Sequence, residues 1–124
     1  MRLLLDTNAF LWWRDASPRL SNEVADEIRD PTTDISVSIV SLWEIAIKRS
    51  IGKLQFRENF AEVMTEEGFD LLGLNYAHLG VLSDLPLHHR DPFDRLLIAQ
   101  AMAEGVAVAT SDKIFARYNV KTFW

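Results

Sequence analysis

The sequence predicts an α/β fold in which a parallel sheet of five strands is flanked by helices. The run Leu3 to Leu5 is unbroken and apolar, which is typical of a strand buried on both faces of a parallel sheet. Four further short apolar or alternating segments follow, each separated from the next by residues with helical spacing. Strands that alternate with helices indicate βα units and therefore a parallel sheet covered by helices.

Composition limits the classes of protein that the chain can belong to. Its 124 residues suffice for one domain, so we expect residues 1–124 to form a single unit. No apolar run is long enough to cross a bilayer, and we expect a cytoplasmic protein with no membrane partner. The absence of cysteine excludes disulfides, zinc thiolate sites and cysteine nucleophiles. The net charge of −5 argues against binding nucleic acid through overall charge.

The predicted elements alternate along the whole chain. Strands are predicted at residues 3–5, 35–39, 69–74, 106–109 and 120–123. Helices are predicted at residues 9–14, 21–30, 41–51, 59–67, 76–82, 93–104 and 111–117. Residues 35–39 alternate between apolar side chains and serine, as strands do.

Capping residues set most of the predicted helix boundaries. Ser21 and Ser41 stand where helix N-caps are expected, and Gly52 and Gly68 stand just past predicted helix ends. The helix at residues 93–104 has the most complete set of signals. Asp91 precedes it as N-cap, proline takes its first position and glycine follows its end. We therefore assign Asp91 to capping first, with a supporting role in a site as a second interpretation.

Four acidic residues occupy comparable positions relative to the predicted strands. They are Asp6, Glu44, Asp94 and Asp112. Asp6 ends the first strand, and Glu44 lies in the first turn of the helix after the second. The other two stand before and after the fourth strand. In a parallel sheet, these positions meet at the carboxyl edge, where ligands bind in open α/β sheets.

Clustered carboxylates repel one another, so a positive charge is expected between them. Hard divalent cations with oxygen ligands fit that position, and we predict one or two Mg²⁺ or Mn²⁺ ions. Bound cations would also cancel part of the acidity where a phosphate binds. The sequence thus remains compatible with a nucleic-acid substrate.

Each acid also has a structural interpretation, which the residues alone leave open. Asp6 can cap the helix that follows it. Glu44 and Lys48 form an i, i+4 pair in the favourable order on a solvated face. Asp94 and Asp112 stand at helix N-termini, where acids are favourable.

Four short motifs occur in order along the chain. They read LLDTN at residues 4–8, SLWEIAIK at 41–48, DPFDRLLIA at 91–99 and TSD at 110–112. Together they resemble the PIN-domain family, and within it the VapC-like ribonuclease toxins of type II toxin–antitoxin modules. The resemblance covers essentially the whole chain.

The resemblance implies a three-layer α/β/α domain with strand order 3-2-1-4-5. It implies that the metal-binding and catalytic residues are Asp6, Glu44, Asp94 and Asp112. Asn8 and Thr110 match polar positions beside these acids. A cognate antitoxin and a homodimer are further expectations from the resemblance.

The first functional hypothesis is a metal-dependent endoribonuclease that acts as the toxin of a toxin–antitoxin pair. The acids would hold the metal, with Glu44 as a ligand or as the residue that orients the attacking water. In-line attack would leave a 5′-phosphate and a 3′-hydroxyl. The RNA backbone could follow a basic run, although the same side chains suit a solvated surface equally well. The run comprises Lys48, Arg49, Lys53 and Arg57.

Two other classes of function compete with this hypothesis. One is an aspartyl phosphotransfer or phosphatase domain with Asp6 as nucleophile on a similar sheet. Asn8 stands where such a phosphatase needs a second acid, and the chain lacks the acid pair of a receiver domain. The other is a catalytically silent antitoxin-binding module, against which the complete set of acids argues.

The helix at residues 41–51 is apolar on nearly all sides. Helices of this kind are usually buried, and part of the surface around Trp43 would be covered by a second protomer or an antitoxin. Symmetric dimers are the commonest oligomers, so a homodimer is expected here.

Overall fold

The computed structural model describes residues 1–124 and contains one sheet of five parallel strands. The strand order is β3-β2-β1-β4-β5, which confirms the fold class and the order that the resemblance implied. Every neighbouring pair is parallel. The strands are β1 (Arg2–Leu5), β2 (Asp34–Ser38), β3 (Asp70–Leu72), β4 (Ala107–Ala109) and β5 (Thr122–Phe123).

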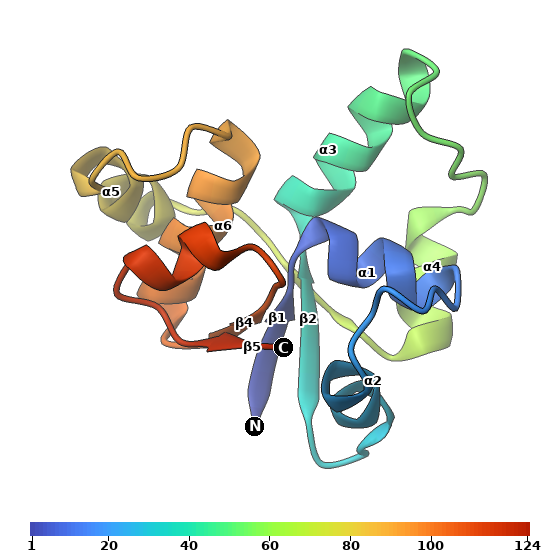
Figure 1. The fold of residues 1–124 in the computed structure, drawn as a ribbon. Helices are drawn as coiled ribbons and strands as arrows, with labels where there is room; N and C mark the ends of the chain where they lie inside the picture. Colours follow the sequence, from blue (N-terminus) through green and yellow to red (C-terminus); the bar gives the residue numbers. More distant parts are fainter.

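Six α-helices and one 3₁₀ helix cover this sheet (Figure 1). The first three are α1 (Thr7–Arg14), α2 (Asn22–Arg29) and α3 (Ile39–Ser50). They are followed by α4 (Phe60–Glu67), α5 (Tyr76–Asp84), α6 (Pro92–Glu104) and the 3₁₀ helix η1 (Lys113–Arg117). In Figure 1, α1, α2 and α4 lie on one side of the strands, and α5, α6 and η1 lie on the other. None of these helices has the length and apolar character needed to cross a membrane.

The central strand β1 separates two apolar cores. Leu3 and Leu5 pack into a core with side chains of α1, α2 and α4. Leu4 points the opposite way, into a core built mainly from α6, β4 and η1. All three leucines are fully buried, as the unbroken apolar run predicted. Asp6, the residue after the strand, therefore lies at the edge of these two apolar cores.

Capping residues fix most helix ends as the sequence predicted. The Ser21 hydroxyl accepts a hydrogen bond from the Val24 N–H at 3.2 Å, and α2 begins there. Gly68 and Gly105 end α4 and α6 with φ angles of 71° and 66°, in the left-handed region that glycine tolerates best.

The start of α3 differs from the prediction. The helix begins at Ile39, because the hydroxyl of Ser38 rather than that of Ser41 accepts the capping hydrogen bond, from the Val40 N–H at 3.0 Å. Ser41 is instead buried within the helix. Glu44 consequently lies in the second turn of α3, and its placement in the first turn was wrong.

The outer strands are shorter than predicted. β3 has three residues and β5 has two, whereas residues 69–74 and 120–123 were expected to be extended. Each outer strand has one hydrogen-bonded neighbour, β2 for β3 and β4 for β5. The apolar side chain of Phe69 that suggested a longer strand is buried but lies outside the paired segment.

The burial of both faces of β1 leads to a stability prediction. Leu4→Ala and Leu5→Ala should each lower the free energy of unfolding by about 2–5 kcal/mol, because each leaves a cavity in a different core. Chemical denaturation followed by circular dichroism measures both values. A large loss for one variant and a negligible loss for the other would contradict a strand that is buried on both faces.

Candidate active site

A polar cleft opens at the carboxyl edge of the sheet. Its volume is about 180 Å³, and none of its lining residues is apolar. The lining residues are Asp6, Thr7, Asn8, Glu44, Lys48, Asp91, Asp94, Ser111 and Asp112. The four acids selected from the sequence therefore come together in one place, from four different segments of the chain.

Asp6 both caps a helix and lines the cleft, so its position is compatible with both interpretations. Its Oδ1 accepts a hydrogen bond from the Ala9 N–H at 2.8 Å, at the N-terminus of α1. Burial raises the pKa of Asp6 to about 6, and the negative charges of Asp112 and Glu44 act in the same direction. Hydrogen bonds from the Ala9 N–H and the Thr110 side chain offset part of this rise.

Asp94 lies in the first turn of α6 and carries the larger pKa shift. Burial raises the pKa of Asp94 to about 7, and the charge of Asp91 adds to the effect. Asp91 is the N-cap of α6, since its Oδ1 accepts hydrogen bonds from the N–H groups of Phe93 at 2.8 Å and Asp94 at 3.0 Å. Asp91 also lines the cleft, a position compatible with the supporting role as well as with capping.

Glu44 reaches the cleft from the second turn of α3 and is only 7% exposed. Its Oε1 accepts a hydrogen bond from the Thr7 hydroxyl at 2.8 Å, which lies 3.0 Å from the Ser41 hydroxyl. Its Oε2 lies 2.7 Å from the ammonium group of Lys48. The predicted i, i+4 pair exists, but its acidic end is buried in the cleft rather than on a solvated face.

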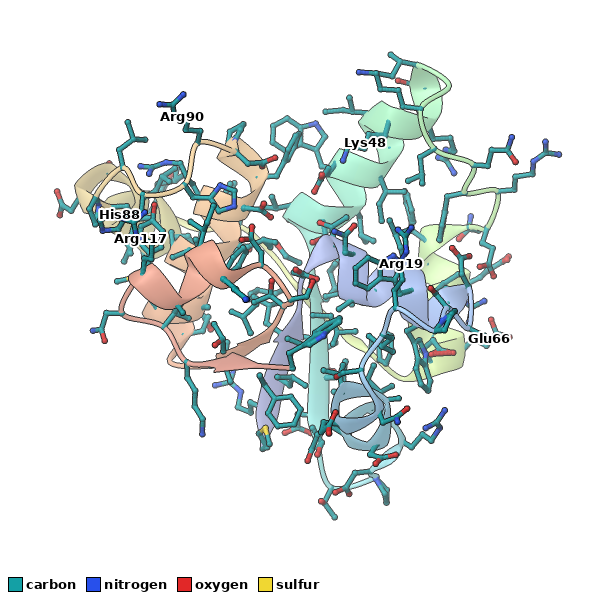
Figure 2. The ribbon with its side chains drawn as sticks, in the orientation of Figure 1. Arg19, Lys48, Glu66, His88, Arg90 and Arg117 are labelled. Carbon is teal, nitrogen blue, oxygen red and sulfur yellow. The ribbon has the colours of Figure 1, made fainter.

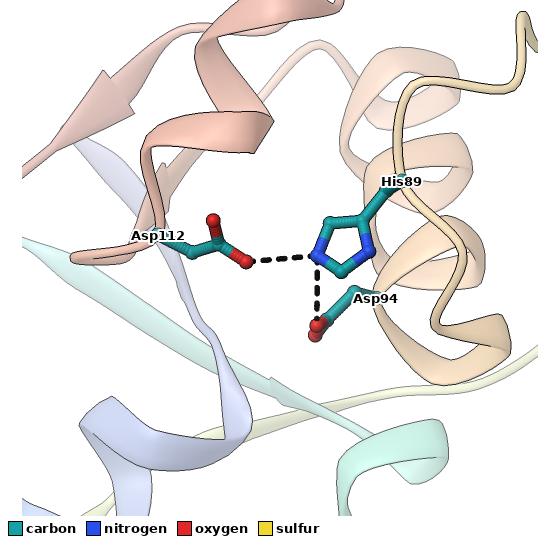
Figure 3. A group of neighbouring side chains, drawn as sticks. All are labelled: His89, Asp94 and Asp112. Carbon is teal, nitrogen blue, oxygen red and sulfur yellow. Dashed lines mark hydrogen bonds and ion pairs between the residues drawn. The ribbon is translucent and has the colours of Figure 1, made fainter.

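The two carboxylate oxygens of Asp112 have different partners, one in a helix cap and the other on the ring of His89. Its Oδ1 accepts a hydrogen bond from the Ile114 N–H at 2.9 Å, at the start of η1. Its Oδ2 lies 2.8 Å from Nε2 of His89, which in turn lies 3.2 Å from Oδ2 of Asp94 (Figure 3). These three residues each offer a ligand atom within 4.8 Å of the others, so they can contribute to a metal site.

Sequence reasoning missed three residues of this site. Thr7 and Ser111 line the cleft but were read only as parts of longer motifs. His89 was not among the residues selected from the sequence, since it adjoins His88 and adjacent histidines lack the helical spacing of metal ligands. Its ring reaches Asp94 and Asp112 through the fold of the loop before α6, and no spacing in the sequence signals that contact.

The supporting residues expected from the resemblance lie close to the acids. Asn8 lines the cleft. Thr110 is buried, and its hydroxyl accepts a hydrogen bond from the Asp112 N–H at 3.1 Å.

The basic run divides into residues with different surroundings. Only Lys48 lines the cleft. The guanidinium of Arg49 donates a hydrogen bond to the Phe56 carbonyl at 3.1 Å and lies 5.2 Å from the centre of the Phe60 ring. Lys53 and Arg57 are exposed and do not line the cleft.

A further cation, Arg90, lies on the loop before α6 and does not line the cleft. Figure 2 shows Lys48 on α3 and Arg90 on the loop before α6. Arg90 is exposed, and sequence analysis did not select it.

The side chains of the cleft suit a hard divalent cation. Carboxylate oxygens are the ligands that Mg²⁺ and Mn²⁺ favour in proteins. The raised pKa values of Asp6 and Asp94 reflect negative charge held in a poorly solvated place, where a cation has its greatest stabilising effect.

A family model describes most of this chain. The model of the PIN domain matches residues 3–121. The chain belongs to the PIN domain family. No curated protein sequence matches the chain.

Three solved structures share the fold with this chain at low sequence identity. The structure of VapBC2 from Rickettsia felis, bound to a promoter DNA fragment, contains a chain that matches with a TM-score of 0.70 and 15% sequence identity. The match covers 100% of this chain and 99% of that chain. A chain of VapBC-1 from nontypeable Haemophilus influenzae matches with a TM-score of 0.68 and 16% sequence identity, over 99% of this chain and 97% of that chain. A chain of FitAcB from Neisseria gonorrhoeae matches with a TM-score of 0.66 and 18% sequence identity, over 98% of this chain and 96% of that chain.

The raised pKa of Asp6 predicts how a neutral side chain alters stability. An aspartate in the unfolded chain has a pKa of about 3.9. If its pKa is higher in the folded state, it lowers stability as the pH rises above about 3.9, and the loss is complete above the folded-state pKa. At pH 8 in EDTA, Asp6→Asn should therefore melt at or above the wild-type temperature, because asparagine caps a helix about as well as aspartate. At pH 5 the difference should shrink, since Asp6, with a pKa of about 6, is then mostly protonated.

Differential scanning fluorimetry measures these melting temperatures, and added Mg²⁺ provides the second readout. Mg²⁺ should raise the wild-type melting temperature, because a ligand that binds only the native state stabilises it. The variant should gain much less. An equal gain for both proteins would show that Asp6 does not contribute to ion binding.

Proposed function

We propose that this PIN domain is a metal-dependent endoribonuclease and the toxin of a toxin–antitoxin pair. Residues 1–124 would form a single nuclease domain. The observation that carries the proposal is the convergence of four acids in one polar cleft, with the pKa values of two of them raised by burial. Those acids are Asp6, Glu44, Asp94 and Asp112.

The four acids would take two roles. Asp6, Asp94 and Asp112 would hold one or two Mg²⁺ or Mn²⁺ ions. When bound, such an ion lowers the pKa of water and offsets charge on the phosphate. Both oxygens of Glu44 are engaged, by Thr7 and Lys48, so Glu44 is oriented in advance, either to complete the ion's ligands or to orient the attacking water.

An RNA phosphate would approach the cleft beside Lys48. The ammonium group of Lys48 lines the cleft, and phosphate contacts of this kind are independent of base sequence. Lys53 and Arg57 would contact the backbone farther from the cleft. Arg49 is a weaker candidate, because its guanidinium already bonds the Phe56 carbonyl. Attack in line with the leaving oxygen would give a 5′-phosphate and a 3′-hydroxyl.

The toxin assignment rests on family membership and the resemblance to VapC-like toxins. The similar chains in VapBC2, VapBC-1 and FitAcB support the same fold over nearly their full length. We propose a cognate antitoxin as partner and a cytoplasmic site of action. The phosphatase alternative loses support, because the position two residues after Asp6 is Asn8.

The nuclease proposal predicts cleavage that depends on a divalent ion. RNA should be cut with Mg²⁺ or Mn²⁺ and left intact in excess EDTA. Asp94→Asn should lower the rate by at least about 100-fold, because even residues that only orient metal ligands can cost 10–100-fold. Expression of the wild type should slow growth, and Asp94→Asn should relieve that effect. Gel analysis and sequencing of the RNA ends measure cleavage.

Asp84→Asn is the matched control for this substitution. Asp84 is an exposed acid at the end of α5, so its variant should cut RNA at the wild-type rate. Circular dichroism should show that both variants are folded. Cleavage that continues at full rate in excess EDTA would rule out the metal mechanism.

The proposed homodimer would cover an apolar groove between α3, α4 and the edge strand β3. Its volume is about 530 Å³, and all of its lining residues are apolar. They are Ile39, Leu42, Trp43, Ala46, Phe60, Ala61, Met64 and Leu71. Trp43 and Leu71 are each 55% exposed, which is unusual for large apolar side chains that share one groove. A second copy placed symmetrically would bury the same groove on both chains.

Light scattering tests the dimer. The wild type should have twice the chain mass of 14.2 kDa at micromolar concentration, and Leu71→Glu should give a monomer because it places a charge in the groove. Leu87→Glu should remain dimeric, since Leu87 is 74% exposed outside the groove. A wild-type monomer would contradict the dimer and favour the antitoxin as the partner that covers this surface.

A further inference from the structure

Several contacts fix the position of His89 in the loop before α6. The Tyr118 hydroxyl accepts hydrogen bonds from the backbone N–H groups of His88 at 2.9 Å and His89 at 2.7 Å. The guanidinium of Arg95 donates to the His89 carbonyl at 3.4 Å. The imidazole of His89 packs edge-on against Phe115, with ring centres 5.9 Å apart.

The hydrogen bonds of the His89 ring indicate which nitrogen carries the proton. Nδ1 accepts a hydrogen bond from the Asp91 N–H at 3.2 Å, so it acts as an acceptor. A neutral imidazole then carries its proton on Nε2. This N–H faces Oδ2 of Asp112 at 2.8 Å and Oδ2 of Asp94 at 3.2 Å (Figure 3).

We propose that His89 is a positioning residue that holds Asp94 and Asp112 in the arrangement that binds the ion. One N–H lies between two carboxylates that otherwise repel each other, and it draws one oxygen of each toward the same point. His89 is 8% exposed, so little water competes for these contacts. This role rests on the proposed metal-dependent function, since His89 acts through the acids and not on the RNA.

Two other roles for His89 make different predictions. A purely structural residue would fill the space beside Phe115, and its loss would lower stability without changing ion affinity. A direct ligand would bind the ion through Nε2, but that nitrogen carries the proton while Nδ1 accepts from Asp91. The observed hydrogen bonds therefore favour the positioning role.

Binding of Mn²⁺ by isothermal titration calorimetry tests the proposal without any RNA. His89→Gln keeps an N–H donor on a side chain that reaches the position of Nε2, whereas His89→Met has nearly the same shape and no donor. We expect His89→Gln to bind Mn²⁺ within a few-fold of wild type. His89→Met should bind about 10–100-fold more weakly, as is typical when a group that orients metal ligands is removed.

His88→Ala is the matched control. The His88 ring packs edge-on against Tyr118, with ring centres 5.1 Å apart, and it has no contact with the acids of the cleft. Its variant should bind Mn²⁺ as the wild type does. Melting temperatures in EDTA should be recorded for all variants, so that a loss of folding is separated from a loss of affinity.

Several outcomes would overturn the positioning role. Wild-type affinity in a folded His89→Met would do so, as would a His89→Gln variant that binds more than tenfold more weakly than wild type. Pulsed electron paramagnetic resonance of bound Mn²⁺ gives a measurement that does not need the Met variant to fold. A nitrogen coupling in wild type that His89→Gln abolishes would make His89 a ligand instead.

The same titration separates this proposal from the proposed function. If wild type binds no Mn²⁺, the metal mechanism fails and the role of His89 fails with it. If wild type binds Mn²⁺ and His89→Met binds it equally well, only the role of His89 is wrong.

Discussion

The charge of Asp6 at the rim of a dry core is the constraint on which the rest of the site depends. Because β1 is buried on both faces, the residue that follows it emerges beside apolar side chains, away from bulk water. Burial, together with the smaller effect of the nearby acids, raises the pKa of Asp6 to about 6. Such a group destabilises the folded chain at neutral pH. The surrounding hydrogen bonds limit this cost without removing it.

Helix N-termini hold the acids in place. Asp6, Asp91 and Asp112 cap α1, α6 and η1, each through its Oδ1. A cap fixes the carboxylate relative to the backbone, and the positive end of the helix partly compensates its charge. A second carboxylate oxygen remains for other partners, as Oδ2 of Asp112 demonstrates by its contact with His89. Capping and site formation are therefore the same structural feature, which is why the sequence alone left the two interpretations open.

Local signals in the sequence predicted most of the fold. Some signals depend only on residues close together in the sequence, and these appear where they were expected. They are the apolar run at β1, the serine cap of α2 and the glycines after α4 and α6. The start of α3 was predicted too late, because Ser38 and Ser41 are both acceptable caps and only tertiary structure selects between them. The convergence of the acids followed from sheet topology. The contact of His89 did not, since it depends on a loop held by Tyr118, which lies 29 residues farther along the chain.

The distribution of positive charge around the cleft bears on where a cation would be most stabilising. Glu44 already has the ammonium group of Lys48 as its partner, and Asp112 accepts hydrogen bonds from the Ile114 N–H and the His89 ring. The pKa values of Asp6 and Asp94 are raised, to about 6 and about 7. A divalent ion near these two would oppose the effects of burial and like charge that raise their pKa values. A bound divalent cation would therefore be most stabilising next to the end of β1 and the start of α6.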